Sequence, residues 1–572
     1  MNPTHAIRHS RDSENPESEQ TEGLSMTPQR LLQHFDRISD APDAIPRLRR
    51  FILDLAVRGK LVEQDPRDEP ASELLKRIHA ERARRSNDRV IRQNSAGNQE
   101  VPDEMPFELP QSWVWSSLGE ISQYGLPDKV NSNKEVSANT WVLDLEDIEK
   151  DTSRLIERVP SSACPFQSSK TRFKQGDVLF GKLRPYLNKV LVADSDGVCT
   201  TEIVPVRGFG GIAPEYIRLV LKSPLTMKRI DRLMYGMKMP RLGTNDALRL
   251  NFPLSPLAEQ QRIVAKVDEL MALCDRLEAT QAERESRRNR LVASSLNRLN
   301  NAVNDDAFPD HARFYFNHLP RFTTKPEHIQ QLRQTILNLA VRGKLVPQDP
   351  SDEHAPEFGI EKEMSEANRI QLKLPSRWSW TRVENVAESR LGKMLDKAKN
   401  SGKPYRYLRN TNVHWFNIKL EELKVLRIEA DEVEKYVLRN GDILICEGGH
   451  GIGRTAVWRG AEPKIVFQKA LHRVRPGLAL NSDFFAYCIC VYFYSGVLQT
   501  YFTGVGIPHF TGVALSKLVF PLPPIKEQQR IVAKVDELMA LCDKFDAQLT
   551  TSHTESCRLL EAMLHEALAP AV

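Results

Sequence analysis

The sequence lacks long apolar runs and is poor in cysteine. No stretch reaches the ~18 consecutive apolar residues that a membrane-spanning helix needs, so none is expected. The eight cysteines are scattered, and the only close pair, Cys488 and Cys490, lies in an apolar run without metal-site partners. The histidines show no metal-ligand spacing either, so we expect no metal site. This cysteine usage is typical of buried thiols in a reduced, cytoplasmic protein.

Catalytic motifs are also missing. The sequence has no D/N-P-P-Y/F motif for adenine methylation and no G-x-x-x-x-G-K-[ST] phosphate loop. The glycine-rich stretch 447–454 follows a strand-like segment, but it lacks the phosphate-loop lysine and a convincing following helix. A surface turn or a ligand-contacting loop is favoured over a nucleotide site. We therefore expect no catalysis and no cofactor in this chain.

Charge of one sign is not in large excess. The 80 basic residues nearly match the 75 acidic ones, which gives a net charge of +5, so any basic footprint must be local. One local run, 76–93, is basic and helix-prone, and it is equally compatible with a binding surface and with a solvated linker helix. The polar stretch 1–25 predicts a disordered tail, and Met1 and Met26 are both possible translation starts.

The chain does contain a long internal repeat. The seventeen residues EQQRIVAKVDELMALCD occur at 259–275 and again, without a substitution, at 527–543. LAVRGKLV at 55–62 returns at 339–346. Weaker landmarks between them also pair, such as LPQSWVW with LPSRWSW and GDVLF with GDILI. One helical scaffold is thus duplicated around two variable domains.

The repeated segments predict helices. Apolar residues follow a narrow 4-3-4-3 stripe, which favours a coiled-coil spacer over an ordinary amphipathic core helix. The stripe consists of Ile263, Val267, Leu270 and Leu277 in the first copy and Ile531, Val535, Leu538 and Phe545 in the second. We expect long helices at 259–300 and 527–564 and shorter ones at 43–58 and 326–342. The central pair can pack antiparallel, and if the chain ends meet they rebuild the same pair, which predicts a circular, pseudo-twofold α+β architecture.

The expected domains follow from these landmarks. They are a disordered tail (1–25), a helical region with the basic linker (26–100), a first variable domain (101–257), a central helical region (258–370), a second variable domain (371–525) and a C-terminal helical region (526–572).

The motif set resembles the specificity subunit of type I restriction-modification enzymes. Each variable domain opens with L-P-x-x-W-x-W, contains G-D-[VI]-L, and ends with F-P-L-x-P before E-Q-x-R-I-V-x-K. The resemblance implies two mixed α/β target-recognition domains, each reading one half of an asymmetric, bipartite DNA site. It further implies two methyltransferase subunits docked on the helical spacers and a restriction-translocase subunit. S-adenosylmethionine, ATP and Mg²⁺ would then belong to those partners.

Candidate DNA contacts are basic, amide and aromatic side chains near predicted strand ends. In the first domain they are Lys182, Arg184, Tyr186, Asn188, Lys189, Lys238, Arg241, Thr244 and Asn245. In the second domain they are Lys393, Lys397, Arg409, Asn410, Asn412, His450, Arg454 and His509, with His509 in the place of Arg241. Two other hypotheses remain, an enzyme that acts on DNA by itself and a coiled-coil scaffold that binds no DNA.

Overall fold

The computed structural model describes residues 41, 43–87, 105–126, 128–301, 308–360, 374–396, 401–460, 464–504 and 506–568. The chain forms two compact units: unit 1 holds residues 1–283 and 553–572, and unit 2 holds residues 284–552. Each unit contains one β-rich domain, here called head 1 (105–256) and head 2 (374–524), and a part of both long helices. The predicted tail, Met26, Lys397 and residues 88–93 of the basic run lie outside the described residues.

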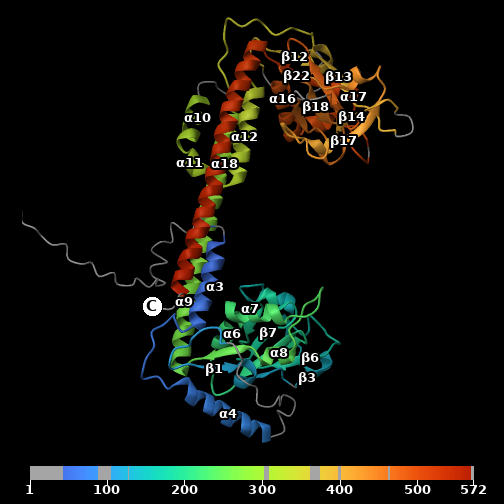
Figure 1. The fold of residues 1–572 in the computed structure, drawn as a ribbon. Helices are drawn as coiled ribbons and strands as arrows, with labels where there is room; N and C mark the ends of the chain where they lie inside the picture. Colours follow the sequence, from blue (N-terminus) through green and yellow to red (C-terminus); the bar gives the residue numbers. More distant parts are fainter. Residues whose placement is uncertain are drawn as a thin grey trace, which may run out of the picture. The chain divides into compact units, whose positions relative to one another are not determined.

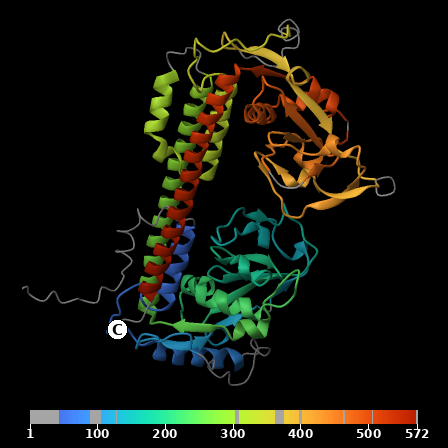
Figure 2. The same ribbon diagram turned by 45° about the horizontal axis from the view of Figure 1, so that its top comes forward.

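Unit 1 brings the first and last described helices together. Helix α3 (Ala44–Val57) lies along the first part of α9 (Leu257–Asn300) and the last part of α18 (Ile525–Leu568) (Figure 1, Figure 2). Ile52 of α3, Val267 of α9 and Leu560 of α18 are buried in one continuous core. Elements from the two ends of the chain therefore meet, as the predicted circular arrangement requires.

Unit 2 repeats this packing with other segments. Helix α12 (Pro326–Val341) packs with the end of α9 and the start of α18, flanked by α10 (Phe308–Asn317) and α11 (Leu319–Phe322). Arg49 of α3 pairs with Asp275 of α9 at 2.6 Å, and Arg333 of α12 pairs with Asp543 of α18 at 2.7 Å. The same helix pair, with the same ion pair on its surface, is thus built twice.

Head 1 is organised around strand β7 (Val178–Gly181), which is buried on both sides. Val178 and Phe180 enter the core shared with the helices, whereas Leu179 faces a second, smaller core. The antiparallel sheet has the order β2-β10-β7-β8, and a five-stranded sheet has the order β3-β6-β9-β4-β5 with β4 and β9 parallel. The remaining strands of these sheets are Ser122–Tyr124 (β2), Lys129–Val130 (β3), Trp141–Leu143 (β4), Val159–Pro160 (β5), Lys170–Phe173 (β6), Val190–Val192 (β8), Gly197–Thr200 (β9) and Ile203–Gly208 (β10).

Short elements complete head 1. Strands β1 (Val114–Ser117) and β11 (Asn251–Leu254) pair next to the long helix. The helices are α5 (Leu118–Ile121), α6 (Pro214–Lys222), α7 (Pro224–Leu233) and α8 (Thr244–Leu248). The basic run forms much of α4 (Ala71–Asn87), whose Leu74 and Ile78 are buried against head 1. Several of its charges are paired locally, as in Arg85–Glu81 at 2.5 Å.

Head 2 has the same plan. Its antiparallel sheet has the order β13-β21-β18-β19, and β18 (Ile443–Cys446) is again buried on both sides, with Ile443 in one core and Leu444 in another. A three-stranded sheet, β17-β14-β20, repeats the parallel pair of head 1, here between β14 and β20. The other elements are β12 (Ser379–Arg382), α14 (Val383–Val386), β13 (Ala387–Leu391), β14 (Lys403–Leu408), β15 (Val413–His414), β16 (Asn417–Ile418), β17 (Lys424–Ile428), α15 (Val433–Tyr436), β19 (Thr455–Val457), β20 (Val466–Phe467), β21 (Leu471–Pro476), α16 (Ser482–Tyr494), α17 (Gly512–Ser516) and β22 (Val519–Leu522). The two heads are therefore two versions of one fold, and the predicted α+β class is confirmed.

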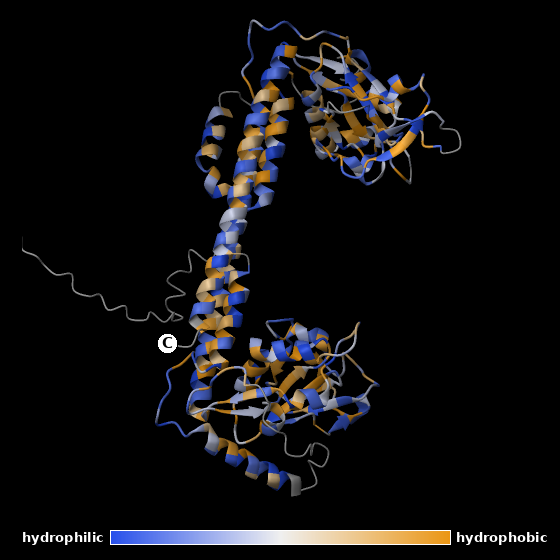
Figure 3. Ribbon diagram, viewed as in Figure 1, coloured by the Kyte–Doolittle hydropathy of each residue, from blue (hydrophilic) through white to orange (hydrophobic). Residues whose placement is uncertain are grey.

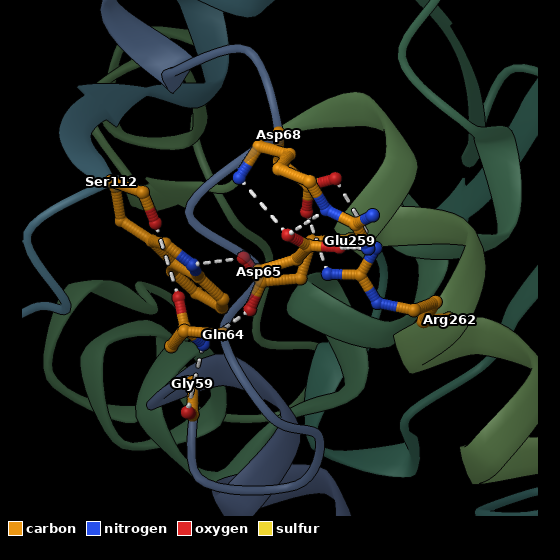
Figure 4. Close-up of polar contacts among 9 residues, drawn as sticks. Gly59, Gln64, Asp65, Asp68, Ser112, Glu259 and Arg262 are labelled. Atoms are coloured by element: carbon orange, nitrogen blue, oxygen red, sulfur yellow. Dashed lines mark hydrogen bonds and ion pairs between the residues drawn. The ribbon is translucent and has the colours of Figure 1, made fainter.

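The repeated E-Q-Q-R start of each long helix fastens it to the segments around it. Glu259 accepts hydrogen bonds from Gln64 Nε2 at 2.5 Å and from Trp113 Nε1 at 2.8 Å, and Arg262 pairs with Asp68 at 2.6 Å (Figure 4). In unit 2 the contacts recur: Gln348 donates to Glu527 at 2.5 Å, and Arg530 pairs with Asp352 at 2.6 Å. We call each set of contacts a latch, because it ties the helix, the repeated segment after the short helix, and, in unit 1, the W-x-W motif.

Apolar residues line the centres of the heads and the helix contacts (Figure 3). Among the described residues, no helix is both long and apolar enough to cross a membrane. In the same ranges, no cluster of three or more His, Cys, Asp or Glu side chains could hold a metal ion.

Candidate nucleic-acid interface

In head 1, an isolated backbone bridge joins the loop that leaves β7 to a second loop, and another bridge closes that second loop on itself. Leu183 bridges Arg241, and Arg241 bridges Tyr235. The Arg184 amide donates to Pro240 O at 2.7 Å, which fixes the two loops against each other. The predicted candidates 182–189 and 238–245 are thereby brought into one place, although they are about fifty residues apart in the sequence.

Head 2 builds the same pair of loops. Gly448 bridges His509, and His509 bridges Thr503. The Phe510 amide donates to Glu447 O at 2.7 Å, as the equivalent Leu242 amide donates to Lys182 O at 3.1 Å in head 1. His509 therefore occupies the place of Arg241.

Three cations of head 1 are available to a ligand. Arg184 and Lys238 are exposed and Lys182 is half-buried. Within the part of the chain that the structure describes, no carboxylate pairs with any of the three. Tyr186, between them in sequence, has 46% of its surface exposed. Unpaired cations beside an exposed aromatic ring suit a phosphate backbone and base edges.

Arg241 is already engaged. Its guanidinium makes two hydrogen bonds of 3.1 Å to the two carboxylate oxygens of Glu202, and this pairing raises the pKa of Arg241. The fork geometry holds Arg241 in one orientation at the loop junction. Thr244 and Asn245 follow at the start of α8, where both side chains are exposed.

Two candidates of head 1 support the loop from within. Asn188 donates through Nδ2 to Lys222 O at 3.4 Å. Lys189 donates through Nζ to Leu145 O at 2.7 Å, and burial lowers the pKa of this lysine. Both residues are half-buried, and these bonds to main-chain oxygens support the loop, while their contact with DNA stays a prediction.

In head 2, His450 is exposed on a one-turn 3-10 helix, Gly449–Gly451. A Cβ added to Gly449 would lie 3.6 Å from Asn410 Nδ2, so Asn410 stands beside this turn. Arg454 is half-buried immediately before β19. The glycine-rich stretch therefore leads from strand to turn to strand, and no helix N-terminus is available to hold a phosphate there.

Other candidates of head 2 are committed within the fold. Lys393 is paired with both Glu429, at 3.1 Å, and Glu432, and these partners raise its pKa. Asn412 is buried, and its amide bonds to main-chain groups of Arg409 and Lys419 at 3.0 Å each. The guanidinium of Arg409 donates to Glu422 O at 3.2 Å. The sequence did not show these partners, because they come from elements far away in the chain or from local turns.

The predicted spacer stripe is inside the chain and not on its surface. Ile263, Val267 and Leu270 are buried in the core of unit 1, and Leu277 packs against it. Ile531 and Val535 are buried in the core of unit 2, with Leu538 and Phe545 packed against it. These residues build the spacer itself, so any partner must dock on other faces of the helices.

Comparisons with known proteins cover heads and helices alike. The family model described as type I restriction modification DNA specificity domain matches residues 375–551. The specificity subunit of the type I restriction enzyme EcoAI from Escherichia coli is 29% identical over 567 residues, which is 92% of this chain and 94% of that subunit. The EcoEI specificity subunit, from the same organism, is 28% identical over 573 residues with the same coverage.

One solved structure is described as the basis of complex assembly and conformational transition of the type I R-M system. A chain in it is 21% identical, with a TM-score of 0.49, over 81% of this chain and 99% of that chain. The sequence relatives carry the conclusion that follows, since they extend over nearly the full length of both proteins.

Proposed function

This chain belongs to the family of type I restriction-modification specificity subunits, and we propose that it supplies the DNA sequence recognition of such a complex. It is not itself catalytic. Each head reads one half of a bipartite DNA site, and partner chains carry out adenine methylation and ATP-dependent restriction.

The observation that carries this proposal is a contrast between the heads. At the junction of the two loops, head 1 presents Lys182, Glu202 and Arg241. The positions that take their place in head 2, matched by the backbone hydrogen bonds of the two loops, are Glu447, Ala470 and His509. One backbone arrangement thus displays different charges and hydrogen-bonding groups. Because base edges in the major groove differ in donors and acceptors, the two heads should select different sequences.

The helical spacers show the opposite pattern, because the exposed residues of their two repeats are identical. In both copies of the seventeen-residue repeat, the same six positions are exposed. They are Gln261, Ala265, Asp268, Glu269, Ala272 and Asp275 in α9 and Gln529, Ala533, Asp536, Glu537, Ala540 and Asp543 in α18. Asp275 and Asp543 serve the repeated ion pairs with Arg49 and Arg333, but core packing does not require identity at the other exposed positions. Two identical surfaces fit two copies of one partner, the methyltransferase subunit, with the restriction subunit joining the complex.

The cofactors are proposed for the partners. S-adenosylmethionine, ATP and Mg²⁺ would act in those chains, since this sequence contains neither the methylation motif nor the phosphate loop. We further propose a cytoplasmic location, where DNA and partner subunits are accessible to a protein with reduced thiols.

The decisive experiment is to map adenine methylation in the genomic DNA of the host by long-read sequencing. An asymmetric motif in two parts, separated by an unread spacer, is expected, and it should disappear when this chain is deleted. A continuous or symmetric motif would contradict the assignment of one half-site to each head. Purified chain that methylates DNA without a partner would contradict the non-catalytic role.

A mobility-shift assay of the assembled complex separates recognition from a scaffolding role. Duplexes that contain the mapped motif should bind more tightly than duplexes in which either half is scrambled. Equal binding to all three would mean that the chain holds partners together without reading DNA.

A further inference from the structure

Lys222 is a buried cation that the recognition surface itself does not use. It is the last residue of α6, and only 9% of its surface is exposed. Its ammonium group donates three hydrogen bonds, to Asp151 O at 2.8 Å, Thr152 O at 3.0 Å and Ser153 Oγ at 2.8 Å. Three acceptors therefore surround the amine. Burial lowers the pKa of Lys222 to about 7, because its charged form loses water without gaining an ion pair. A lysine placed at that cost is expected to serve a purpose.

The three acceptors belong to a turn that supports the loop after β7. Ser153 Oγ donates to Asn188 O at 2.9 Å and accepts from the Val190 amide at 3.0 Å. The Asp151 amide donates to Leu187 O at 3.0 Å. Asn188 in turn donates through Nδ2 to the main-chain oxygen of Lys222. A closed network thus runs from the end of α6 through the turn to the loop that carries Arg184.

This region holds unusual backbone conformations. Asp151, Ser153, Arg184 and Asn188 have φ values of 61°, 59°, 49° and 53°. They are four of the seven non-glycine residues with positive φ in the described part of the chain. Glycine adopts this region freely and Asn and Asp tolerate it, whereas residues such as Ser153 and Arg184 persist there only where surrounding contacts enforce it. The network around Lys222 supplies such contacts.

Head 2 reaches the same loop shape without strain. The positions equivalent to Arg184 and Asn188 are Gly449 and Gly453, with φ values of 73° and 79°. Glycine adopts this conformation freely because it has no Cβ. The Ala213 amide before α6 and the Asn481 amide before α16 donate to the matched residues Gln260 and Gln528. Counted from there, the position equivalent to Lys222 is Cys490, a buried residue of α16.

The equivalence is fixed by hydrogen bonds across the base of each loop. The Gly181 amide donates to Lys189 O at 3.0 Å in head 1, and the Cys446 amide donates to Arg454 O at 2.9 Å in head 2. Head 1 alone therefore combines a strained loop with a buried ammonium group.

We propose that Lys222 is a positioning residue of head 1, whose ammonium group holds the 184–188 loop in the conformation that presents Arg184 to DNA. Head 1 gains a cation at a position where head 2 has only glycine, and Lys222 makes that placement possible. The predicted effect on DNA discrimination rests on the proposed function, whereas the predicted effect on the order of the loop does not.

The first arm of the test measures loop order in the full chain. In Lys222→Met, hydrogen exchange of the amides 187–190 should be at least about tenfold faster than in the wild type. The turn that accepts hydrogen bonds from Lys222 also bonds to Leu187, Asn188 and Val190, so loosening the turn should loosen this loop. Ser153→Ala removes the link between Lys222 and Asn188 without burying a new charge, and it should have the same effect. Unchanged exchange in both folded variants would overturn the proposal, whatever the chain binds.

The second arm measures recognition by the assembled complex. Duplexes with single-base changes in either half-site report the discrimination of each head. Lys222→Met should lower discrimination about tenfold at the half-site that Arg184→Ala also affects, since one good base contact accounts for about that factor. The other half-site should be read as before. Cys490→Ser, the matched change in head 2, should leave the Arg184 half-site unaffected.

A rescue separates positioning from general stability. Asn188→Gly installs the residue that head 2 has at the equivalent position, Gly453, and glycine adopts a positive φ more freely than asparagine, so in the Lys222→Met background it should restore part of the lost discrimination. Equal loss at both half-sites, or a loss without faster loop exchange, would contradict a positioning role. If the wild-type complex shows no sequence preference, the proposed function fails, whereas the exchange measurement still decides what Lys222 does.

Discussion

Trp113 donates a hydrogen bond from its indole Nε1 to Glu259 Oε2 at 2.8 Å, across 146 residues of sequence. The contact joins the W-x-W motif at the entrance of head 1 to the first turns of the long helix that leaves it. Gln64 donates to the other carboxylate oxygen at 2.5 Å. A single carboxylate therefore connects head, long helix and the segment after α3.

Replacing Glu259 with alanine should destabilise unit 1 selectively. The change leaves two donors, on Trp113 and Gln64, without their acceptor, and a lost buried partner costs about 1–3 kcal/mol. Hydrogen exchange, followed peptide by peptide, should show that α3 and the start of α9 open more readily. Glu527→Ala is the matched control and should affect α12 and the start of α18 instead. A variant that opens neither unit would show that the latches are dispensable.

The same carboxylate should give unit 1 a measurable pH dependence. Burial raises the pKa of Glu259 above 4.5, despite the hydrogen bonds from Trp113 and Gln64. The folded state then binds more protons than the unfolded state just above pH 4.5, so this group favours folding increasingly as pH falls through its folded pKa. Glu259→Gln has no carboxyl group to protonate, so it lacks this pH-dependent contribution to stability. The stability difference between wild type and variant, from urea denaturation at pH 7 and at pH 5, should shift toward the wild type at the lower pH; a constant difference would contradict the raised pKa.

Removing cations at the loop junction should weaken one half-site only. Arg184→Ala deletes an exposed, unpaired cation, so its whole effect should fall on DNA binding, at about 1–3 kcal/mol if it contacts a base. Arg241→Ala should impair the same half-site, but it also leaves Glu202 without its partner. Competition binding of the complex with half-site variants measures both. His509→Ala should affect the other half, and equal damage to both halves by any of the three would contradict separate reading by the heads.

The sequence was informative wherever the chain repeats itself. The helices at 44–57, 257–300, 326–341 and 525–568 lie close to those expected, because the apolar stripe and the proline and glycine stops are local signals. The placement of His509 opposite Arg241 was also readable, since both follow a shared glycine and proline pattern. The latch residues lie within repeated motifs, so repetition marked them, although it did not reveal their roles.

The residues that the sequence missed occur in one head only. Lys222 and Glu202 have Cys490 and Ala470 in their places, so no repetition marked them. Conversely, Lys393 and Asn412 were predicted as DNA contacts from their residue types, whereas in the structure they bond to Glu432 and Lys419. The sequence could not show these partners, because the path of the turns that contribute them depends on tertiary packing. Composition identifies a cation or an amide, whereas burial and pairing decide whether it is available.

The cysteines should react in two classes. Six are buried, and burial raises the pKa of Cys199, Cys446 and Cys490 to about 12. Because the thiolate is the nucleophile, these groups should stay unmodified by maleimide at pH 7–8. Cys164 and Cys557 are half-buried and should be modified first. Mass spectrometry of peptides after a short reaction would test this, with urea-unfolded protein as the control in which all eight react. Rapid labelling of Cys490 in the native chain would contradict its burial in head 2.

Charged substitutions in the spacer stripe should destabilise unit 1 more than unit 2. Leu270 is 7% exposed within the core of unit 1, whereas its repeat partner Leu538 is only partly buried in unit 2. Aspartate at either site forces a carboxylate toward an apolar contact, and the penalty grows with burial. Leu270→Asp should therefore destabilise its unit by several kcal/mol, and Leu538→Asp by less. Urea denaturation, monitored by hydrogen exchange of α3 for unit 1 and of α12 for unit 2, measures which variant is destabilised more.

Assembly should follow the same order. Size-exclusion chromatography with the methyltransferase partner should show a larger loss of complex for Leu270→Asp than for Leu538→Asp, since the docking surface depends on a well-formed helix beneath it. Glu269→Gln and Glu537→Gln change the exposed face that we propose meets the partner, so they should weaken assembly while leaving both cores intact. If the exposed pair abolished assembly while the chain stayed folded, the repeat would be identified as the contact surface itself. If the core variants assembled normally, the stripe would not support the docking face.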